Sequence, residues 1–255
     1  VNIQTSEHVL AALTGLEIDN VLIEIDASEP PIMDGSSKFF VKALIDAGIE
    51  EQSKDRNEYV VKEIISYHDE ESGSDITVLP ADSYEVTAMV DFGTKILGTQ
   101  NATMKNLNEF KDNFSNARTF SFLHEIEMLV DNGLIKGGDL NNAIVYVDKK
   151  ISDDTMVKLK KAFNKDKVSV KSNGILDNLN LHYPNEAARH KLLDVIGDLA
   201  LIGKRIRGKI IAKKPGHKTN TKFAKMISEI INRESEFEKK KIKYSKEAIM
   251  DSQDI

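Results

Sequence analysis

The chain has 255 residues, a formal net charge of −6 at neutral pH and no cysteine. This length is enough for one or two domains with a well-buried core. The acidic balance argues against a general nucleic-acid-binding protein, because neutralising phosphates requires a basic face, and the lack of cysteine excludes disulfides and thiolate metal sites. No apolar run approaches the ~20 residues that span a bilayer, and no secretory signal is visible, so we expect a cytoplasmic protein.

The N-terminal third alternates between helical and strand-like patterns. Apolar periodicity predicts a helix at Ser6–Leu16, with His8 in its first turn. The run Val21–Ile25 predicts a strand, and Ser37–Ala47 predicts a second helix that ends before Gly48. Alternating apolar residues then predict strands over residues 59–67, 76–79 and 85–92.

The second half carries longer helical patterns. Helices are predicted over residues 122–132 and 153–163, with a strand between them at 143–147. The run Asn185–Gly203 predicts a long amphipathic helix, which a strand at 206–212 and a helix at 219–233 follow.

The order helix, strand, loop, helix therefore occurs twice, over residues 6–47 and 185–233. This order predicts an α+β fold of two similar sheet-plus-helix domains packed together, with the active site between them, where ligand sites commonly lie. We expect a first domain over residues 1–55, a second over 56–233, and a linker over 234–255.

Two polar positions on the predicted helix 185–203 fit a metal site. His190 and Asp194 are four residues apart, a spacing that stacks an imidazole and a carboxylate on one face. They could form only an exposed pair worth a few tenths of a kcal/mol, but a carboxylate in an apolar run is unfavourable unless a partner compensates it. With His8 as third ligand and Glu7 beside it as a base, they predict a catalytic zinc site with one open position.

One stretch departs from the acidic balance. Residues 204–218 contain seven basic residues and no acidic one. Such a stretch in an acidic protein suits a discrete anion such as a diphosphate.

Five motifs occur together in this chain: Ser6-Glu7-His8-Val9-Leu10, Ile32-Met33-Asp34-Gly35-Ser36, Ala117-Arg118-Thr119-Phe120, Arg189-His190-Lys191-Leu192-Leu193-Asp194-Val195-Ile196-Gly197-Asp198 and Gly216-His217-Lys218-Thr219-Asn220. In type and order they resemble those of the UDP-3-O-acyl-N-acetylglucosamine deacetylases, zinc hydrolases of lipid A biosynthesis in Gram-negative bacteria. The resemblance covers residues 1–233. The opening strands of the family's first domain are absent, so we expect an N-terminal part to be missing.

The resemblance implies one Zn²⁺ per chain, held by three ligands: His8, His190 and Asp194. Glu7 would take the proton from the attacking water. Thr119 would stabilise the oxyanion together with the zinc, and His217 would act as the cationic general acid. Asp198, one turn beyond Asp194, would hold the His217 imidazolium and raise its pKa.

The implied substrate is a UDP-linked acylated glucosamine, from which the N-acetyl group is removed. Lys191 is expected to contact the sugar and Phe120 the fatty-acyl linkage. The acyl chain requires an apolar passage, which we expect in an insert over residues 120–147 that includes Leu140 and Ala143. The sequence alone does not separate such a passage from an ordinary core. We expect no nucleic-acid partner and a transient contact with the inner membrane surface.

The last residues, 234–255, differ from the rest of the chain in composition. Residues 234–247 are rich in Glu and Lys and predict a solvated linker. Residues 248–255 resemble the opening of a beta-hydroxyacyl-acyl-carrier-protein dehydratase domain, which is fused to this deacetylase in some bacteria. The alternative is a disordered tail.

A second class of function stays open at this point. Paired α+β halves with a basic loop also occur in ribosomal and other nucleic-acid-binding proteins, so the chain could be a non-catalytic binding module. The net acidity weighs against that module, as does the co-occurrence of the site residues: Glu7, His8, His190, Asp194 and His217.

Overall fold

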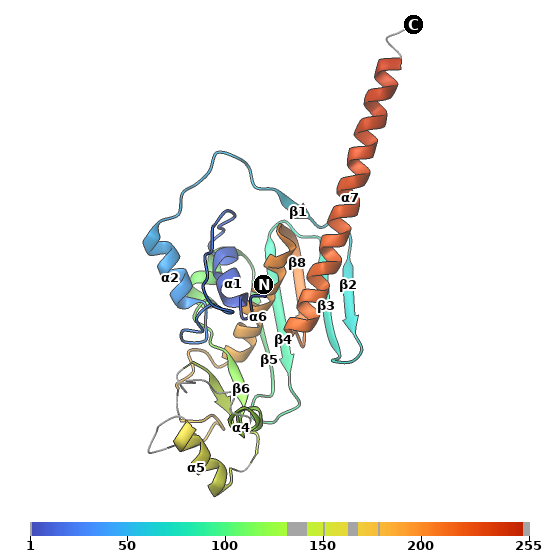
Figure 1. The fold of residues 1–255 in the computed structure, drawn as a ribbon. Coiled ribbons are helices and arrows are strands. Elements are labelled where there is room, and N and C mark those ends of the chain that lie inside the picture. Colours follow the sequence, from blue (N-terminus) through green and yellow to red (C-terminus); the bar gives the residue numbers. More distant parts are fainter. Residues whose placement is uncertain (1, 132–141, 150, 163–167, 178, 252–255) are drawn as a thin grey trace.

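The computed structural model describes residues 2–131, 142–149, 151–162, 168–177 and 179–251 (Figure 1). Within these residues, six strands form the main sheet in the order β2-β3-β8-β4-β5, with β1 paired to β8. The strands are β1 (Glu58–Val60), β2 (Ile65–Asp69), β3 (Ser74–Leu79), β4 (Tyr84–Asp91), β5 (Thr99–Met104) and β8 (Arg205–Lys213).

The sheet is built around β8, which runs antiparallel to β3 and parallel to β4. Residues alternate between buried and more exposed positions along β3, β4 and β8, as expected where one face of a sheet meets the core. The register places Ile210 opposite both Val78 and Val86, so the inward side chains of the three strands form one apolar layer.

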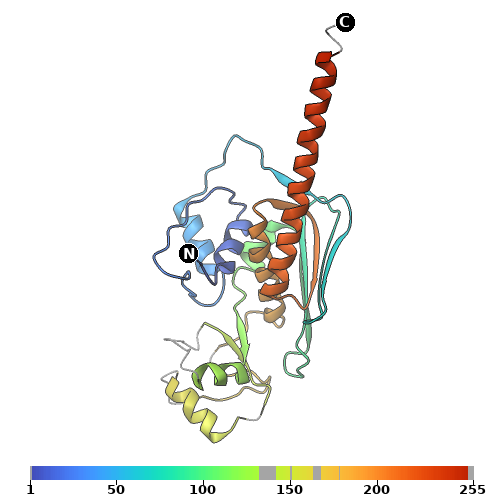
Figure 2. The ribbon, with the colours of Figure 1, turned by 45° about the vertical axis from the view of Figure 1, so that its right-hand side comes forward.

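Helix α6 (Glu186–Leu199) lies between this sheet and α1 (Glu7–Gly15), as Figures 1 and 2 show. Almost every residue of α6 is buried, because the helix contacts β4 and β5 on one side and α1 on the other. The two helices approach closely at Gly197, where a Cβ atom would lie 2.1 Å from the Glu7 carbonyl oxygen. This contact brings the start of α1 against the middle of α6.

The described residues between 120 and 177 form a smaller unit at the opposite end of the molecule from the C-terminus (Figure 1). It contains β6 (Phe120–Phe122), α4 (Leu123–Asp131), β7 (Ile144–Tyr146) and α5 (Asp153–Ala162), with β6 and β7 paired in parallel. It has an apolar cluster of its own, formed by Leu123, Ile126, Val145, Val147, Leu159 and Leu176.

The last helix, α7 (His217–Asp251), is much longer than the expected helix over 219–233. Its first half packs on α6 and β3, and its second half projects away from the fold (Figures 1 and 2), where Phe237 is 71% exposed. Residues 234–247, expected as a solvated linker, are therefore helical, because Glu and Lys are good helix formers and neither Gly nor Pro interrupts them. No helix in the described part of the chain is long and apolar enough to cross a membrane.

The mixed α+β class is confirmed, but the strand expected at Val21–Ile25 is wrong. These residues are irregular and exposed, and no strand in the described ranges pairs with them. A strand requires a neighbour to satisfy its backbone groups, whatever its composition. The first copy of the expected repeat thus consists of α1 and α2 (Lys38–Ala47) without a strand, and the division into two similar domains stays a prediction.

Four short elements were not anticipated from the sequence. They are β5, the turn η1 (Leu107–Glu109), α3 (Phe110–Asn113) and β6. The sequence of β5, Thr-Gln-Asn-Ala-Thr-Met, has little apolar alternation, and pairing with β4 along its whole length defines this strand.

Candidate metal centre

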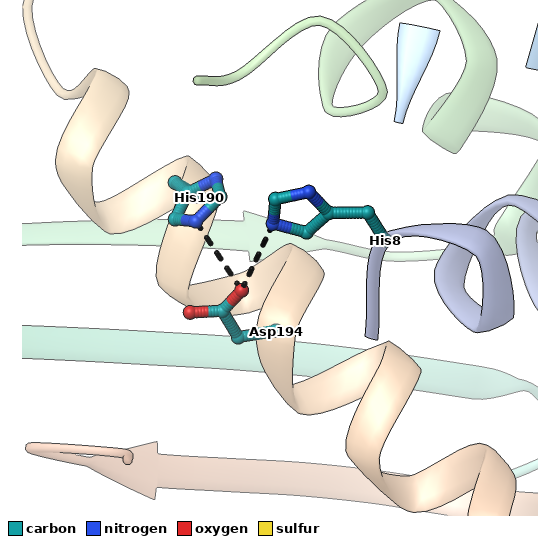
Figure 3. A group of neighbouring side chains, drawn as sticks. All are labelled: His8, His190 and Asp194. Atoms are coloured by element: carbon teal, nitrogen blue, oxygen red, sulfur yellow. Dashed lines mark ion pairs between the residues drawn. The ribbon is translucent and has the colours of Figure 1, made fainter. Parts of the chain in front are cut away.

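Three side chains from two distant segments converge between α1 and α6 (Figure 3). The Nε2 atom of His190 lies 3.3 Å from Oδ1 of Asp194, and Nε2 of His8 lies 4.0 Å from the same oxygen. All three residues are at least 97% buried. One ligand atom from each lies within 4.8 Å of the others, so a single cation could contact all three.

Within the described residues, hydrogen bonds occupy one polar atom of His190 and one of Asp194, and leave the other atom of each available to a cation. Nδ1 of His190 donates to the Ala117 carbonyl at 3.0 Å in the tautomer that leaves Nε2 unprotonated. Asp194 Oδ2 accepts from Lys191 Nζ at 2.8 Å, whereas the buried Oδ1 has no hydrogen-bond partner in the described part of the chain. A buried carboxylate oxygen without a donor is unfavourable, and a metal ion would supply the missing partner.

The ionisation states also suit a cation. Burial lowers the pKa of His190 to about 4, so its ring is neutral and able to act as a ligand near pH 7. Burial works against the charge on Asp194, yet the His190 ring and the Lys191 ammonium hold the pKa of this carboxyl below its usual range. Two imidazoles and one carboxylate form a donor set that zinc accepts in catalytic sites, with one position left open.

Two further titratable groups border the cluster. Glu7 Oε1 lies 4.0 Å from His8 Nε2 and 3.9 Å from His217 Nε2. His217 is the first residue of α7, and its Nε2 is 3.9 Å from Asp194 Oδ2. The segment before it, with Lys214 at φ 49°, turns the chain from β8 into α7 and so directs the ring towards α6.

Asp198 orients the His217 ring through a hydrogen bond. Its Oδ2 lies 2.9 Å from His217 Nδ1 and accepts a second hydrogen bond from Asn220 Nδ2 at 2.8 Å. The hydrogen bond to Asp198 is the main reason that the pKa of His217 rises to about 9. His217 is therefore cationic at neutral pH, with its Nε2 3.9 Å from Asp194 Oδ2.

A sequence model of the UDP-3-O-acyl N-acetylglycosamine deacetylase family matches residues 1–168 and 156–229 of this chain. The chain belongs to this family. The membership confirms the resemblance that the five motifs indicated, and it places His8, His190 and Asp194 within the matched residues.

Two relatives that are named as bifunctional enzymes are about equally similar to this chain. The chain is 45% identical over 241 residues to the bifunctional enzyme LpxC/FabZ of Chlorobaculum tepidum, and 45% identical over 227 residues to that of Bacteroides thetaiotaomicron. The alignments cover 91% and 89% of this chain but 50% and 49% of those proteins. The chain thus spans about half the length of these curated relatives.

A single-function relative extends the comparison. The UDP-3-O-acyl-N-acetylglucosamine deacetylase of Nitratidesulfovibrio vulgaris is 36% identical over 228 residues. That alignment covers 89% of this chain and 66% of the relative.

The expected substrate-contact residues lie at varying distances from the centre. Lys191 Nζ bonds Asp194 and lies 5.6 Å from the centre of the Phe120 ring, which is itself 6.5 Å from the His190 ring. Thr119 is half-buried, two residues beyond the Ala117 carbonyl that His190 contacts, and its backbone N–H donates to Gly35. Ala143 is half-buried directly before β7, and Leu140 lies outside the described residues.

The basic stretch over residues 204–218 is not a bare cationic patch. Neighbouring elements place carboxylates beside four of its side chains, in the pairs Arg205–Glu17, Lys209–Glu85, Lys213–Asp75 and Lys218–Glu71. These partners come from residues far away in sequence, so the stretch looked uncompensated when read alone. The pairs weaken the case for a diphosphate site there.

Sequence reasoning missed three residues around the centre. Asn220 is buried and holds Asp198, and it lies in the Gly216–Asn220 motif, which could have indicated it. The Ala117 carbonyl carries no side-chain signal at all. Phe92, directly after β4, has its ring 5.5 Å from that of Phe120, a contact between segments far apart in sequence.

Proposed function

We propose that this chain is a zinc-dependent deacetylase that removes the N-acetyl group from UDP-3-O-acyl-N-acetylglucosamine in lipid A biosynthesis. The observation that carries the proposal is the buried cluster of His8, His190 and Asp194, with Asp194 Oδ1 lacking a donor in the described residues. Membership of the deacetylase family supports the substrate class, and the relative from Nitratidesulfovibrio vulgaris is named for this activity.

His8, His190 and Asp194 would hold one zinc ion through Nε2, Nε2 and Oδ1. Zinc at such a three-ligand site supplies Lewis acidity, which polarises an amide carbonyl and makes water nucleophilic at neutral pH. The remaining steps fall to residues of the chain.

Glu7 and His217 divide the proton transfers between them. The Glu7 carboxylate, next to ligand His8, accepts a proton from the attacking water as its oxygen bonds to the acetamide carbon. His217, held cationic by Asp198, stabilises the negative charge that develops on the carbonyl oxygen. When the carbon–nitrogen bond breaks, His217 donates a proton to the leaving amine, and acetate is the other product.

The remaining predicted contacts are consistent with substrate binding beside these groups. Lys191 and Phe120 lie next to one another at the edge of the metal centre, so a charged and an apolar side chain are available together beside it. We propose that they meet the sugar and the acyl linkage, with the Thr119 hydroxyl on the oxyanion. The apolar residues of the 120–147 segment, Ala143 among them, would continue towards the acyl chain.

Two relatives are named as bifunctional enzymes, and this leads to a proposal about the domain organisation. We propose that the chain is the deacetylase part of a polypeptide that continues into a dehydratase, with α7 as the helical connection. We also propose that residues 1–55 and 56–233 act as two domains around the site. In favour of a helical connection is the course of α7 beyond Arg233, where residues 234–241 are mostly exposed. No observation favours the non-catalytic binding module.

The direct test is acetate release. The purified protein, supplied with zinc, is incubated with UDP-3-O-acyl-N-acetylglucosamine, and both the released acetate and the free amine are quantified by mass spectrometry. We expect turnover that a chelator abolishes and zinc restores. A zinc-loaded protein that releases no acetate would reject the proposed reaction.

A further inference from the structure

A second buried charge pair lies next to the metal centre. Arg118 Nε donates to Glu186 Oε1 at 2.9 Å, and only 6% and 0% of the two side chains are exposed. Taking two charges out of water is so unfavourable that such a pair rarely adds stability over an apolar replacement. Its presence beside the site therefore points to a consequence other than stability.

Glu186 also holds backbone groups on two segments. Its carboxylate accepts from the Arg118 N–H at 3.2 Å and from the His182 N–H at 2.6 Å. Arg118 in turn donates to the Asn180 carbonyl at 2.6 Å. Since Glu186 is the first residue of α6, these bonds tie both segments to the start of the helix that carries two candidate metal ligands.

One peptide unit is hydrogen-bonded to α6 through both its N–H and its C=O. The unit between Ala117 and Arg118 donates its N–H to Glu186, and its C=O accepts from His190 Nδ1 at 3.0 Å. Glu186 and His190 are four residues apart and so lie on the same helix face. A peptide unit is planar and rigid, so fixing its N–H also fixes the direction of its carbonyl.

We propose that Glu186 is a positioning residue for the metal ligand His190, a proposal that rests on the zinc site proposed above. Through the Ala117–Arg118 peptide, Glu186 keeps a carbonyl acceptor in front of His190 Nδ1. That acceptor retains the proton on Nδ1 and leaves Nε2 facing Asp194. Loss of such an indirect support typically weakens metal binding by about 10–100-fold.

The test separates stability from metal affinity with two variants. In the double variant Arg118→Met with Glu186→Leu, no buried charge is left unpaired, but the Arg118 and His182 N–H groups lose their Glu186 acceptor. We therefore expect this variant to unfold cooperatively at a somewhat lower temperature than the parent. Its peptide unit is no longer held, so its zinc Kd, measured by chelator competition, should rise by about 10–100-fold. Glu186→Gln keeps an oxygen acceptor for the Arg118 N–H but leaves Arg118 uncompensated. It should unfold at a lower temperature and yet bind zinc more nearly like the parent.

Two further measurements sharpen the result. In metal-free protein, nitrogen NMR of the imidazoles should show His190 protonated at Nδ1 in the parent and a mixture of tautomers in the double variant. Tyr183→Phe is the matched control, because its hydroxyl bonds Asp112 and Asn116 just before Ala117, and it should keep the parent Kd.

The outcomes separate this inference from the proposed function. If the parent binds zinc and the double variant binds it equally tightly, Glu186 does not position His190. If the parent binds no zinc at all, the metal centre fails and this inference fails with it. Weaker zinc binding in the double variant with an unchanged His190 tautomer would also overturn the proposal.

Discussion

In the candidate site, three side chains each use one polar atom for a hydrogen bond within the protein. His190 uses Nδ1 on the Ala117 carbonyl, and His217 uses Nδ1 on Asp198. Asp194 uses Oδ2 on Lys191. The atoms without a hydrogen bond to any described residue, Nε2 of His190 and Oδ1 of Asp194, are the ones that lie towards His8 (Figure 3). The i,i+4 spacing predicted the His190–Asp194 pair, but the partner of each remaining atom lies on another element and has no signal in the local sequence.

Replacing Glu7 tests the division of roles at this scale. Glu7→Gln keeps the shape of the side chain but cannot accept a proton from water. We expect full zinc content and a kcat/KM that falls by a factor on the order of 10²–10⁴, the usual loss for a general base. Acetate release and metal content should be measured on one preparation, with the exposed Glu24→Gln as control. Near-parent turnover in Glu7→Gln would mean that another group is the base.

The raised pKa of His217 makes a prediction about stability in metal-free protein. Its pKa is about 9 in the folded chain, above the ordinary 6.5, because Asp198 favours the charged ring. A group whose pKa rises on folding stabilises the fold fully below its unfolded pKa, and this contribution disappears as pH rises through the folded pKa. The free energy of unfolding should therefore differ most between parent and His217→Ala below pH 6.5, and this difference should shrink as the pH rises to about 9. Denaturant titrations with chelator present would measure it, and a difference independent of pH would contradict the Asp198–His217 pair.

Single elements were predicted well where their apolar periodicity was strong, and poorly where pairing with another strand determines the structure. Helix α6 follows from its apolar repeat, and β3 and β4 follow from alternation. In contrast, β5 exists through its pairing with β4, and the apolar run at 21–25 forms no strand because no described strand lies beside it. Composition reports what a segment would bury, but hydrogen-bond partners come from elsewhere in the chain.

The close contact of α1 with α6 is testable at Gly197. Ala is favoured over Gly inside a helix by about 1 kcal/mol, so Gly197→Ala would stabilise an isolated α6. In the protein, the added Cβ would meet the Glu7 carbonyl at 2.1 Å, and α1 would have to move away. We therefore expect a net loss of about 1–3 kcal/mol in the free energy of unfolding, together with weaker zinc binding because His8 moves with α1. A variant that is more stable than the parent and binds zinc normally would contradict this packing.

At the scale of the whole molecule, the fold brings the site together from four places in the sequence. Helix α1 carries Glu7 and His8, the segment before β6 carries the Ala117 carbonyl, α6 carries His190, and the start of α7 carries His217. Motifs far apart in sequence predicted that these segments converge, because the family resemblance supplied the common site. They did not predict that Arg205 and Lys218 find carboxylate partners, since charge compensation across a fold requires its topology. The boundaries near residues 55 and 233 stay predictions.

Metal content tests the central claim most directly. Elemental analysis of the purified parent, His190→Ala and Asp194→Ala should find about one zinc ion per parent chain, as expected for a three-ligand catalytic site. Both variants should be folded and free of zinc, because each loses a ligand from a well-packed helix. The control His68→Ala, at an exposed position of β2, should keep the parent content. Stoichiometric zinc in both ligand variants, or none in the parent, would contradict the account.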